Sequence, residues 1–188
     1  MHSQPGFNGS QICAYLGAIR QHLFLQFWED SVAFEVWCQS PKAKELDQGR
    51  PRGLYTVQRS GKYWELLLET RGDSEGNFLN LGMLQVLDEG RWEEFLVQRR
   101  EHDASALEAE GLVSMQCYKY VGKPLGRYYT ALTTLVLARR RGRADYERSV
   151  ERAIAQEVAK PPAYKSITHE LRSVTGLYDI ISEATTSK

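Results

Sequence analysis

Residues able to do acid–base or metal chemistry are few and widely spaced in this sequence. The histidines are His2, His22, His102 and His169, and the cysteines are Cys13, Cys38 and Cys117. No two histidines stand four residues apart, the spacing at which a helix presents both to one metal ion. The cysteines form no CxxC pair, so a structural zinc site is not indicated. We therefore expect neither a metal site nor a cofactor.

Three carboxylates lie close together in a segment with strand character. Glu65 and Glu69 share one face of a predicted strand, and Asp73 follows in a turn. Such a cluster could hold the divalent ion of a nuclease. Cross-strand pairing with Arg59 or Lys62 explains the acids more simply. Because no phosphate-binding glycine loop or GxSxG motif occurs either, the sequence predicts that the protein is not an enzyme.

Cations and aromatic residues alternate in two segments, each of which we predict to contain a pair of strands. The residues concerned are Arg59, Lys62 and Tyr63 in the first segment and Lys119, Tyr120, Arg127 and Tyr128 in the second. On a sheet, aromatic rings can stack on bases while neighbouring cations contact phosphates, as in proteins that bind single strands. A tyrosine-rich sheet packed under a helix is the alternative.

The stretch LARRRGR, residues 137–143, concentrates positive charge just after the second of these segments. Its arginines are Arg139, Arg140, Arg141 and Arg143. They are our candidates for phosphate contacts. Asp145, Glu147 and Glu151 follow at once and suit the first turns of a helix, where the macrodipole favours negative charge. The alternative is that the arginines pair with these acids and hold only the start of that helix.

Composition limits how strong a nucleic-acid binder this chain could be. Its 188 residues contain 24 lysines and arginines against 24 acids, so any anion-binding surface must come from local segregation of charge. No apolar run is long enough for a membrane span, and isolated cysteines fit a reducing compartment. We expect a soluble intracellular protein, cytoplasmic or nuclear. A mitochondrial location stays an alternative, because residues 12–27 carry one arginine and no acid.

Hydrophobic spacing predicts an α+β fold in a single domain, 1–188. Apolar residues three to four apart predict an N-terminal helix within 1–30. Residues 31–109 predict four strands and then a helix, with Ser60 and Gly61 turning a hairpin and Asp88 capping the helix. Residues 110–160 predict two strands and a helix, and residues 161–188 a proline linker and a C-terminal helix. The expected architecture is an antiparallel sheet of about five to six strands, backed by helices, with amphipathic helices at both termini.

A PPxY sequence stands in the proline linker, formed by Pro161, Pro162 and Tyr164. Such a segment can adopt polyproline II and dock on the aromatic groove of a WW domain. Two prolines between helices also serve simply as a helix stop. We favour the linker, and docking on a WW-domain or assembly partner is the alternative.

Residues 31–108 resemble a known type of repeat. SVAFEVWCQ, followed by GKYWELLLETRGDSEGNFLNLGMLQVLDEGRWEEFLVQ, has the order of four strands and then a helix. This pattern is similar to the repeat of the Whirly and purine-rich-element-binding families of single-stranded nucleic-acid binders. The resemblance implies a curved antiparallel sheet that holds the nucleic acid on one face and a helix that covers the other.

From these observations we predict a non-catalytic protein that binds single-stranded RNA or DNA through the basic and aromatic residues named above. The alternative is a structural or adaptor subunit of a larger assembly, such as a viral one. That subunit would interact through its amphipathic helices and the PPxY segment, and it could form homo-oligomers.

Overall fold

A computed structural model describes residues 4–17, 21–49, 64–72, 75–107, 111–124, 129–159, 162–170 and 176–185. Its strands are β1 (Phe7–Tyr15), β2 (His22–Trp28), β3 (Trp64–Arg71), β4 (Phe78–Val86), β5 (Leu112–Tyr120), β6 (Thr133–Arg140), β7 (Thr168–Glu170) and β8 (Gly176–Thr185). Its α-helices are α1 (Ser31–Gln39), α2 (Pro41–Gln48), α3 (Trp92–Leu107) and α4 (Arg143–Ala159). Two short 3-10 helices, Glu89–Arg91 and Ala163–Ser166, complete the described elements.

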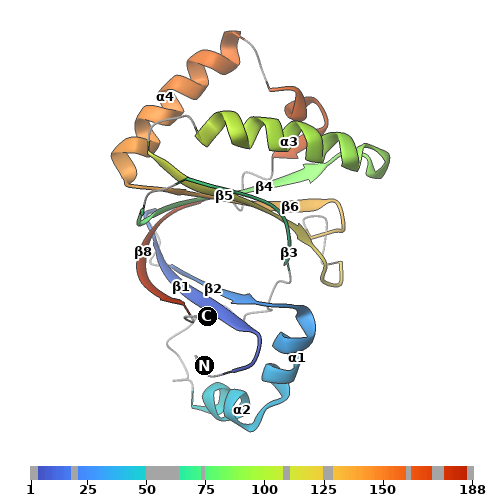
Figure 1. Cartoon of the computed structure of the whole chain (residues 1–188), viewed down its shortest axis with the longest axis vertical. Coiled ribbons are helices and arrows are strands. Elements are labelled where there is room, and N and C mark those ends of the chain that lie inside the picture. Colours follow the sequence, from blue (N-terminus) through green and yellow to red (C-terminus); the bar gives the residue numbers. More distant parts are fainter. Residues whose placement is uncertain are drawn as a thin grey trace.

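All the described strands join one antiparallel sheet. Its order is β2-β1-β8-β4-β6-β5-β3, and the short β7 pairs with β4 beyond the start of β8. The sheet curls strongly, with α3 and α4 on its outer side and β1 and β2 closing below its inner side (Figure 1). A curled sheet of this kind buries side chains on both faces, which alternate along each strand.

Residues 78–185 form the core of this arrangement. The elements follow the order β4, α3, β5, β6, α4, β8, and the four long strands lie side by side as β8-β4-β6-β5. Two split βαβ units with both helices on one face define the ferredoxin-like fold. The N-terminal strands extend this core at one edge of the sheet, where β1 pairs with β8, and β3 extends it at the other, where it pairs with β5.

Alternate residues of the sheet enter two separate apolar clusters. The inner cluster, on the concave face, contains Cys13, Leu79, Leu81, Met83, Leu135, Leu137 and Tyr178. The outer cluster, under α3, contains Val86, Phe95, Leu112, Met115, Cys117, Val136, Ala138 and Ile167. Strand β4 shows the alternation directly, because Leu79, Leu81 and Met83 point inward while Val86 points outward.

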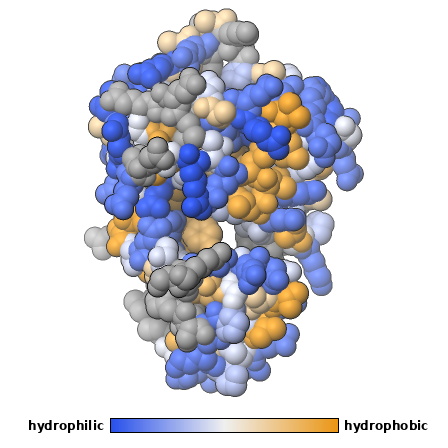
Figure 2. Space-filling view, in the orientation of Figure 1, coloured by the Kyte–Doolittle hydropathy of each residue, from blue (hydrophilic) through white to orange (hydrophobic). Residues whose placement is uncertain are grey.

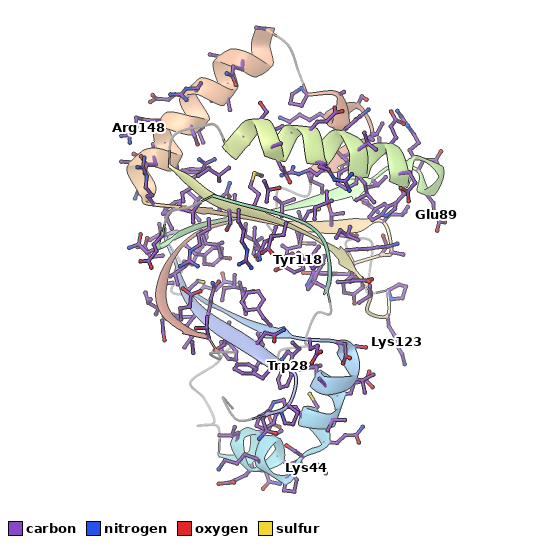
Figure 3. All side chains as sticks on the ribbon, viewed as in Figure 1. Trp28, Lys44, Glu89, Tyr118, Lys123 and Arg148 are labelled. Carbon is purple, nitrogen blue, oxygen red and sulfur yellow. The ribbon has the colours of Figure 1, made fainter. Side chains whose placement is uncertain are left out.

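The N-terminal segment closes the concave face. Leu23 and Leu25 of β2 pack against the inner cluster from across the curl. In the side-chain view, Tyr118 points from β5 into the curl, and Trp28 lies below it near α1 (Figure 3). The molecule is hollowed between the part that carries α1 and α2 and the part that carries α3 and α4 (Figure 2).

Helix α3 begins and packs as its sequence predicts. The Asp88 side chain accepts a hydrogen bond from the Gly90 amide at the preceding 3-10 turn, and Phe95, Arg99 and Asp103 follow at spacings of four on the buried face. Phe95 is fully buried in the outer cluster, so its replacement by alanine would cost about 3–5 kcal/mol.

The predicted α+β class, the antiparallel sheet and the two backing helices are confirmed, but the sheet contains eight strands among the described residues, more than predicted. The helices predicted at the two termini are wrong. Residues 7–15 and 22–28 form β1 and β2, and residues 176–185 form β8. These three strands pair with one another or with β4, and such long-range pairing overrides the local apolar spacing.

The predicted strand at residues 31–39 is also wrong, because SVAFEVWCQ forms α1. Asp30 caps this helix by accepting from the Ala33 amide, and Phe34 and Trp37 then meet the ring of Trp28 from one helix face. The first strand of the predicted hairpin lies outside the described residues. Among the described residues of 31–108, only β3 and β4 are strands, so the order of four strands and a helix is not found there.

Candidate functional site: a cleft between helix α4 and the sheet

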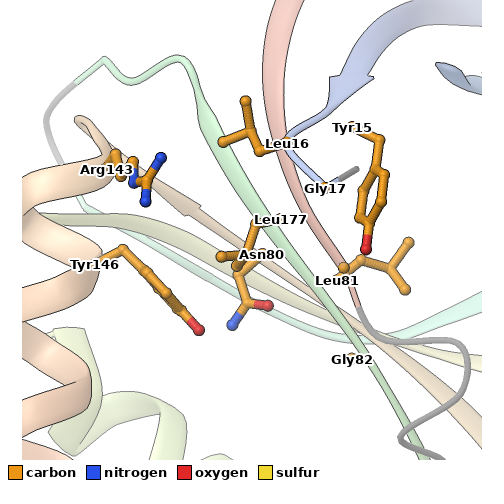
Figure 4. Close-up of a pocket in the computed structure, with 10 residues that line it drawn as sticks. Tyr15, Leu16, Gly17, Asn80, Leu81, Gly82, Arg143, Tyr146 and Leu177 are labelled. Carbon is orange, nitrogen blue, oxygen red and sulfur yellow. The ribbon is translucent and has the colours of Figure 1, made fainter. Parts of the chain in front are cut away.

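A cleft of about 410 Å³ opens where the N-terminal turns of α4 meet the sheet. Its lining residues are Tyr15, Leu16, Gly17, Asn80, Leu81, Gly82, Arg143, Tyr146, Gly176 and Leu177. They come from the end of β1, the middle of β4, the start of β8 and the first turns of α4 (Figure 4). The volume lies within the range of small-molecule sites, about 300–1,000 Å³.

Strand β4 leaves the floor of the cleft open. Since Leu79, Leu81 and Met83 face inward, Asn80 and Gly82 face the helices. A Cβ atom added to Gly82 would meet nothing within 4 Å. Glycine within a strand commonly marks a place where a ligand or another backbone approaches closely. Here it leaves space against the sheet that a larger side chain would fill.

The pairing of β4 changes at the same point. Leu81 is paired with Gly176 of β8, whereas Leu84 is paired with Glu170 of β7. Between them, Gly82 and Met83 have β6 as their partner strand within the described sequence. The cleft therefore lies beside the point where the partner strand of β4 changes from β8 to β7.

Helix α4 touches the sheet mainly through its first turns. Tyr146 packs on Phe78 of β4 with a distance of 5.4 Å between ring centroids. Farther along, the helix leads away from the sheet (Figure 1), and Ile154 is 60% exposed. Because the helix diverges, the outer face of β4 beside Asn80 and Gly82 is left accessible.

Polar groups without protein partners project from the wall of this cleft. Within the described part of the chain, the carboxamide of Asn80 and the hydroxyls of Tyr15 and Tyr146 form no hydrogen bond. Asn80 and Tyr146 point into the same space, and Arg143 lies above them (Figure 4). A carboxamide and two phenols can donate to or accept from the oxygen atoms of a bound molecule.

The arginines of residues 139–143 do not form one surface. Arg139 lies on the inner face and binds Glu183, with 2.8 Å between Nη2 and Oε2, while Arg140 lies on the helix side over the ring of Tyr146. Arg141 and Arg143 bind Asp145 and Glu147, at 3.2 and 2.8 Å. The last two pairs are those expected if the arginines hold the start of the helix. Only Arg143 lines the cleft.

The other predicted binding residues are also engaged within the protein. Lys119 stacks over the ring of Trp92, with Nζ 4.6 Å from the centroid, on the helix side of the sheet. The buried Tyr120 donates its hydroxyl to the Lys123 carbonyl at 2.7 Å and packs on Trp64 on the inner face. Neighbouring residues of β5 thus point to opposite faces, and their cations and rings do not alternate on one accessible face.

Several predicted residues lie outside the described part of the chain. These are Arg59, Lys62, Tyr63, Arg127, Tyr128 and Pro161, together with the side chain of Tyr164. Pro162 is described, and its carbonyl accepts from the Lys165 amide at 3.1 Å. That bond closes a 3-10 turn, whereas polyproline II has no internal hydrogen bonds.

The described residues contain neither a metal-ion cluster nor a membrane-spanning helix. No group of three or more histidine, cysteine, aspartate or glutamate side chains there is placed to hold a metal ion. Within the same residues, no helix is long and apolar enough to cross a membrane.

Comparison with known proteins identifies the fold through structures alone, since no family model and no curated protein sequence matches the chain. An anthrone oxidase-like protein superposes with a TM-score of 0.65 and 10% identity, over 99% of this chain and 81% of that one. A Lactobacillus acidophilus protein, provisionally named a monooxygenase, gives 0.62 and 11%, over 98% and 82%.

A third similar structure carries the name of the fold. It is a Listeria monocytogenes ferredoxin-fold protein related to antibiotic biosynthesis monooxygenases, with a TM-score of 0.51 and 9% identity, over 95% of this chain and 97% of that one. At these identities the likeness shows the ferredoxin-like fold, in agreement with the strand order. The chain therefore shares its fold with these proteins.

These neighbours overturn the functional predictions made from the sequence. Proteins with this fold that superpose on the chain carry monooxygenase and oxidase names, and are not Whirly or purine-rich-element-binding repeats. The predicted resemblance is wrong, and so are the predicted single-strand binding and the adaptor alternative. The prediction that the protein is not an enzyme is overturned by the same finding. The physical reason is that the cations and rings of the strands are divided between two faces.

Sequence reasoning missed every cleft residue except Arg143. A signal was present in FLNLGML, where Asn80 and Gly82 interrupt an otherwise apolar strand on one face. A polar residue and a glycine at alternate positions of a buried strand point to a nearby ligand or a close approach. Tyr15, Leu177 and Tyr146 come from distant segments, so only the fold brings them together.

Proposed function

We propose that the cleft binds a flat, mainly apolar small molecule that bears an oxygen substituent, and that the protein oxidises this molecule with dioxygen. The apolar walls from Leu16 and Leu177 would hold the rings. Asn80 and Tyr146 would hydrogen-bond the oxygen substituent. Small-molecule sites commonly combine an apolar lining with a few polar groups that fix the ligand's orientation.

One observation carries this proposal: Asn80, Tyr15 and Tyr146 line a cleft whose floor is a strand glycine, and their side-chain polar groups have no hydrogen-bond partner among the described residues. A half-buried polar group gains little by facing apolar walls, because it forgoes hydrogen bonds with water. A ligand that supplies the missing bonds would recover that loss. Gly82 provides the depth for a ring to lie against the sheet.

The oxidation step is suggested by the names of the structural neighbours, of which one is anthrone oxidase-like. In an anthrone-type compound, dioxygen converts the ring CH₂ into a carbonyl: R₂CH₂ + O₂ gives R₂C=O + H₂O. One oxygen atom enters the product and the other leaves as water. The CH₂ carbon supplies all four electrons, so the step balances without a further reductant.

Oxygen uptake with an anthrone as substrate tests this proposal. The chain of 188 residues should consume oxygen faster than the spontaneous reaction. We expect Gly82→Leu to abolish the acceleration, because the leucine fills the cleft. Asn80→Ala and Tyr146→Phe should each lower kcat/KM by about fivefold to tenfold, as expected for loss of one hydrogen bond. Asn77→Ala is the matched control, since Asn77 is an exposed asparagine just before β4.

Uptake equal to the spontaneous rate in the wild-type protein would refute the oxidation. Binding is measured separately, by fluorescence titration with the neutral probe N-phenylnaphthylamine. If Gly82→Leu binds this probe as tightly as the wild type does, the cleft is not the ligand site.

A further inference from the structure

Behind the cleft wall lies the half-buried guanidinium of Arg140, whose hydrogen-bonding capacity is only partly used. The Nε and Nη1 atoms of Arg140 are buried and have no hydrogen-bond partner among the described residues. Burial is the main cause that lowers the pKa of this arginine. Buried charges are normally paired and hydrogen-bonded, because removing an ion from water is costly. Arg140 is therefore an exception that calls for a compensating group.

The side chains around Arg140 do not supply that group. Its guanidinium lies 5.9 Å from the ring centroid of Tyr146, and its cross-strand neighbours are Phe78 and Leu112. Asp145 is near enough to affect its pKa. That carboxylate, however, already binds the guanidinium groups of two other arginines, Arg141 and Arg148.

The start of α4 therefore carries an excess of positive charge. Four arginines lie here against two carboxylates, so this group carries two more positive charges than negative ones. The arginines are Arg140, Arg141, Arg143 and Arg148, and the carboxylates are Asp145 and Glu147. Arg148 lies on the outer side of the helix (Figure 3). Arg140 lies half-buried on the sheet side, where water screens its charge less than it screens a fully exposed charge.

Tyr146 connects this charge to the cleft. One face of its ring carries the guanidinium of Arg140, and the residue itself lines the cleft, into which its side chain points (Figure 4). An anionic oxygen that accepts a hydrogen bond from the Tyr146 hydroxyl would lie within about 11 Å of the guanidinium, from the length of a tyrosine side chain and one hydrogen bond. At that separation the attraction through a protein interior is still appreciable.

We propose that Arg140 makes the cleft selective for aromatic ligands that carry a negatively charged oxygen, such as a phenolate, carboxylate or sulfonate. This inference rests on the proposed function, because it assigns the charge of the molecule that the cleft binds. Arg140 acts through Tyr146 and through its field; it does not line the cleft. It is thus a specificity-determining residue behind the binding surface.

Two fluorescent probes that differ by one sulfonate group test the proposal. Anilinonaphthalene sulfonate carries the anionic group, and N-phenylnaphthylamine has the same rings without it. We expect the wild-type full chain to bind the sulfonate about tenfold more tightly than the neutral probe, as a charge at this distance implies. In Arg140→Met, the Kd of the neutral probe divided by the Kd of the sulfonate should fall to about one. The Kd of the neutral probe itself should not change.

Arg140→Lys keeps the charge and should keep most of the preference, which separates charge from packing. Arg148→Met is the matched control, because it removes an arginine of the same cluster on the outer side of the helix; it should leave the ratio unchanged. Circular dichroism verifies the fold of each variant. Methionine is expected to be tolerated, since an apolar isostere of a buried charge is often neutral or stabilising.

The two proposals fail in different ways. If Gly82→Leu weakens both probes but Arg140→Met leaves their ratio at the wild-type value, the selectivity proposal is overturned and the cleft stands. An equal fall of the ratio in Arg148→Met also overturns it. If Gly82→Leu weakens neither probe, the cleft itself is not the site, and both proposals fail.

Discussion

At the scale of single residues, Asn80 and Gly82 give the cleft its character. Both face the helices from the middle of β4, between inward-pointing leucines and a methionine. Asparagine places a donor and an acceptor where the alternation of the strand would otherwise place an apolar side chain. Glycine removes the side chain that would cover the sheet. Stability alone would favour larger apolar residues at both positions, so we interpret the pair as serving a ligand.

The cysteines give a prediction at this scale. Burial raises the pKa of Cys13 to about 11 and that of Cys117 to about 12. Cys38 is exposed on α1, and its pKa is raised mainly by partial burial. The thiolate is the reactive form. At pH 8 only Cys38 should therefore react rapidly with an aromatic disulfide reagent, and its rate should rise with pH.

Absorbance of the released thiolate counts the reactive groups. The native protein should show one rapid group, and protein in denaturant should show all three cysteines. Cys38→Ser should remove the rapid phase. Two or more rapid groups in the native wild type would mean that Cys13 or Cys117 is less buried than described.

At the scale of elements, the sequence predicted well the segments whose pattern is decided locally. Helix α3 follows a cap at Asp88, and β4, β5 and β6 have long apolar runs. The prediction failed for segments whose structure is determined by pairing with strands far away in the sequence. In β1 and β8 both faces carry apolar residues: Cys13 and Tyr178 are buried, whereas Ile12 and Ile181 are exposed. Apolar residues on both faces of a strand can also fall at helical spacing.

The cleft was beyond prediction for a related reason. It needs the end of β1, the start of β8 and the first turns of α4 to meet beside β4. The sequence predicted helix α4, but it assigned helices to the segments that form β1 and β8. Without those strands, Tyr15 and Leu177 could not be placed near Asn80. A site assembled from elements of one sheet is only as predictable as the strand order of that sheet.

The buried ion pair of α3 gives the prediction at this scale. Arg99 and Asp103 are 3% and 1% exposed, with 2.7 Å between Nη2 and Oδ1. Arg99→Met leaves the carboxylate buried without this partner, and we expect it to lower the free energy of unfolding by about 3–5 kcal/mol. Replacing both residues, by Arg99→Met with Asp103→Leu, should restore most of this loss, because no buried charge then stays unpaired.

Urea denaturation measures both effects. Glu45→Gln is the control, since it breaks the exposed Lys42–Glu45 pair of α2 and should change stability by no more than about 1 kcal/mol. A double variant as unstable as Arg99→Met alone would show that the loss comes from packing rather than from the unpaired charge.

At the scale of the whole molecule, the extra N-terminal strands close a face that the ferredoxin-like core leaves apolar. Leu23 and Leu25 cover the inner cluster from β2, and β1 joins the sheet through β8. The N-terminal segment is therefore bound to the core by both hydrogen bonds and apolar contacts. That continuity is the physical basis for keeping the prediction of a single domain.

A single domain should unfold in one cooperative step. Far-ultraviolet circular dichroism reports the sheet and helices together, and the fluorescence of Trp28 and Trp37 reports the N-terminal part if Trp64 and Trp92 are replaced by phenylalanine. We expect the two urea transitions to coincide. A fluorescence transition at lower urea than the dichroism transition would show that the N-terminal part unfolds separately.

The most direct measurement of the central claim is an amide NMR titration of the labelled full chain with anilinonaphthalene sulfonate. We predict saturable shifts centred on the amides of Gly82, Tyr146 and Leu177, and in Gly82→Leu we expect the amides of Tyr146 and Leu177 not to respond. Shifts that centre instead on inner-face residues such as Leu135 and Tyr118, or no shifts at the cleft, would contradict it.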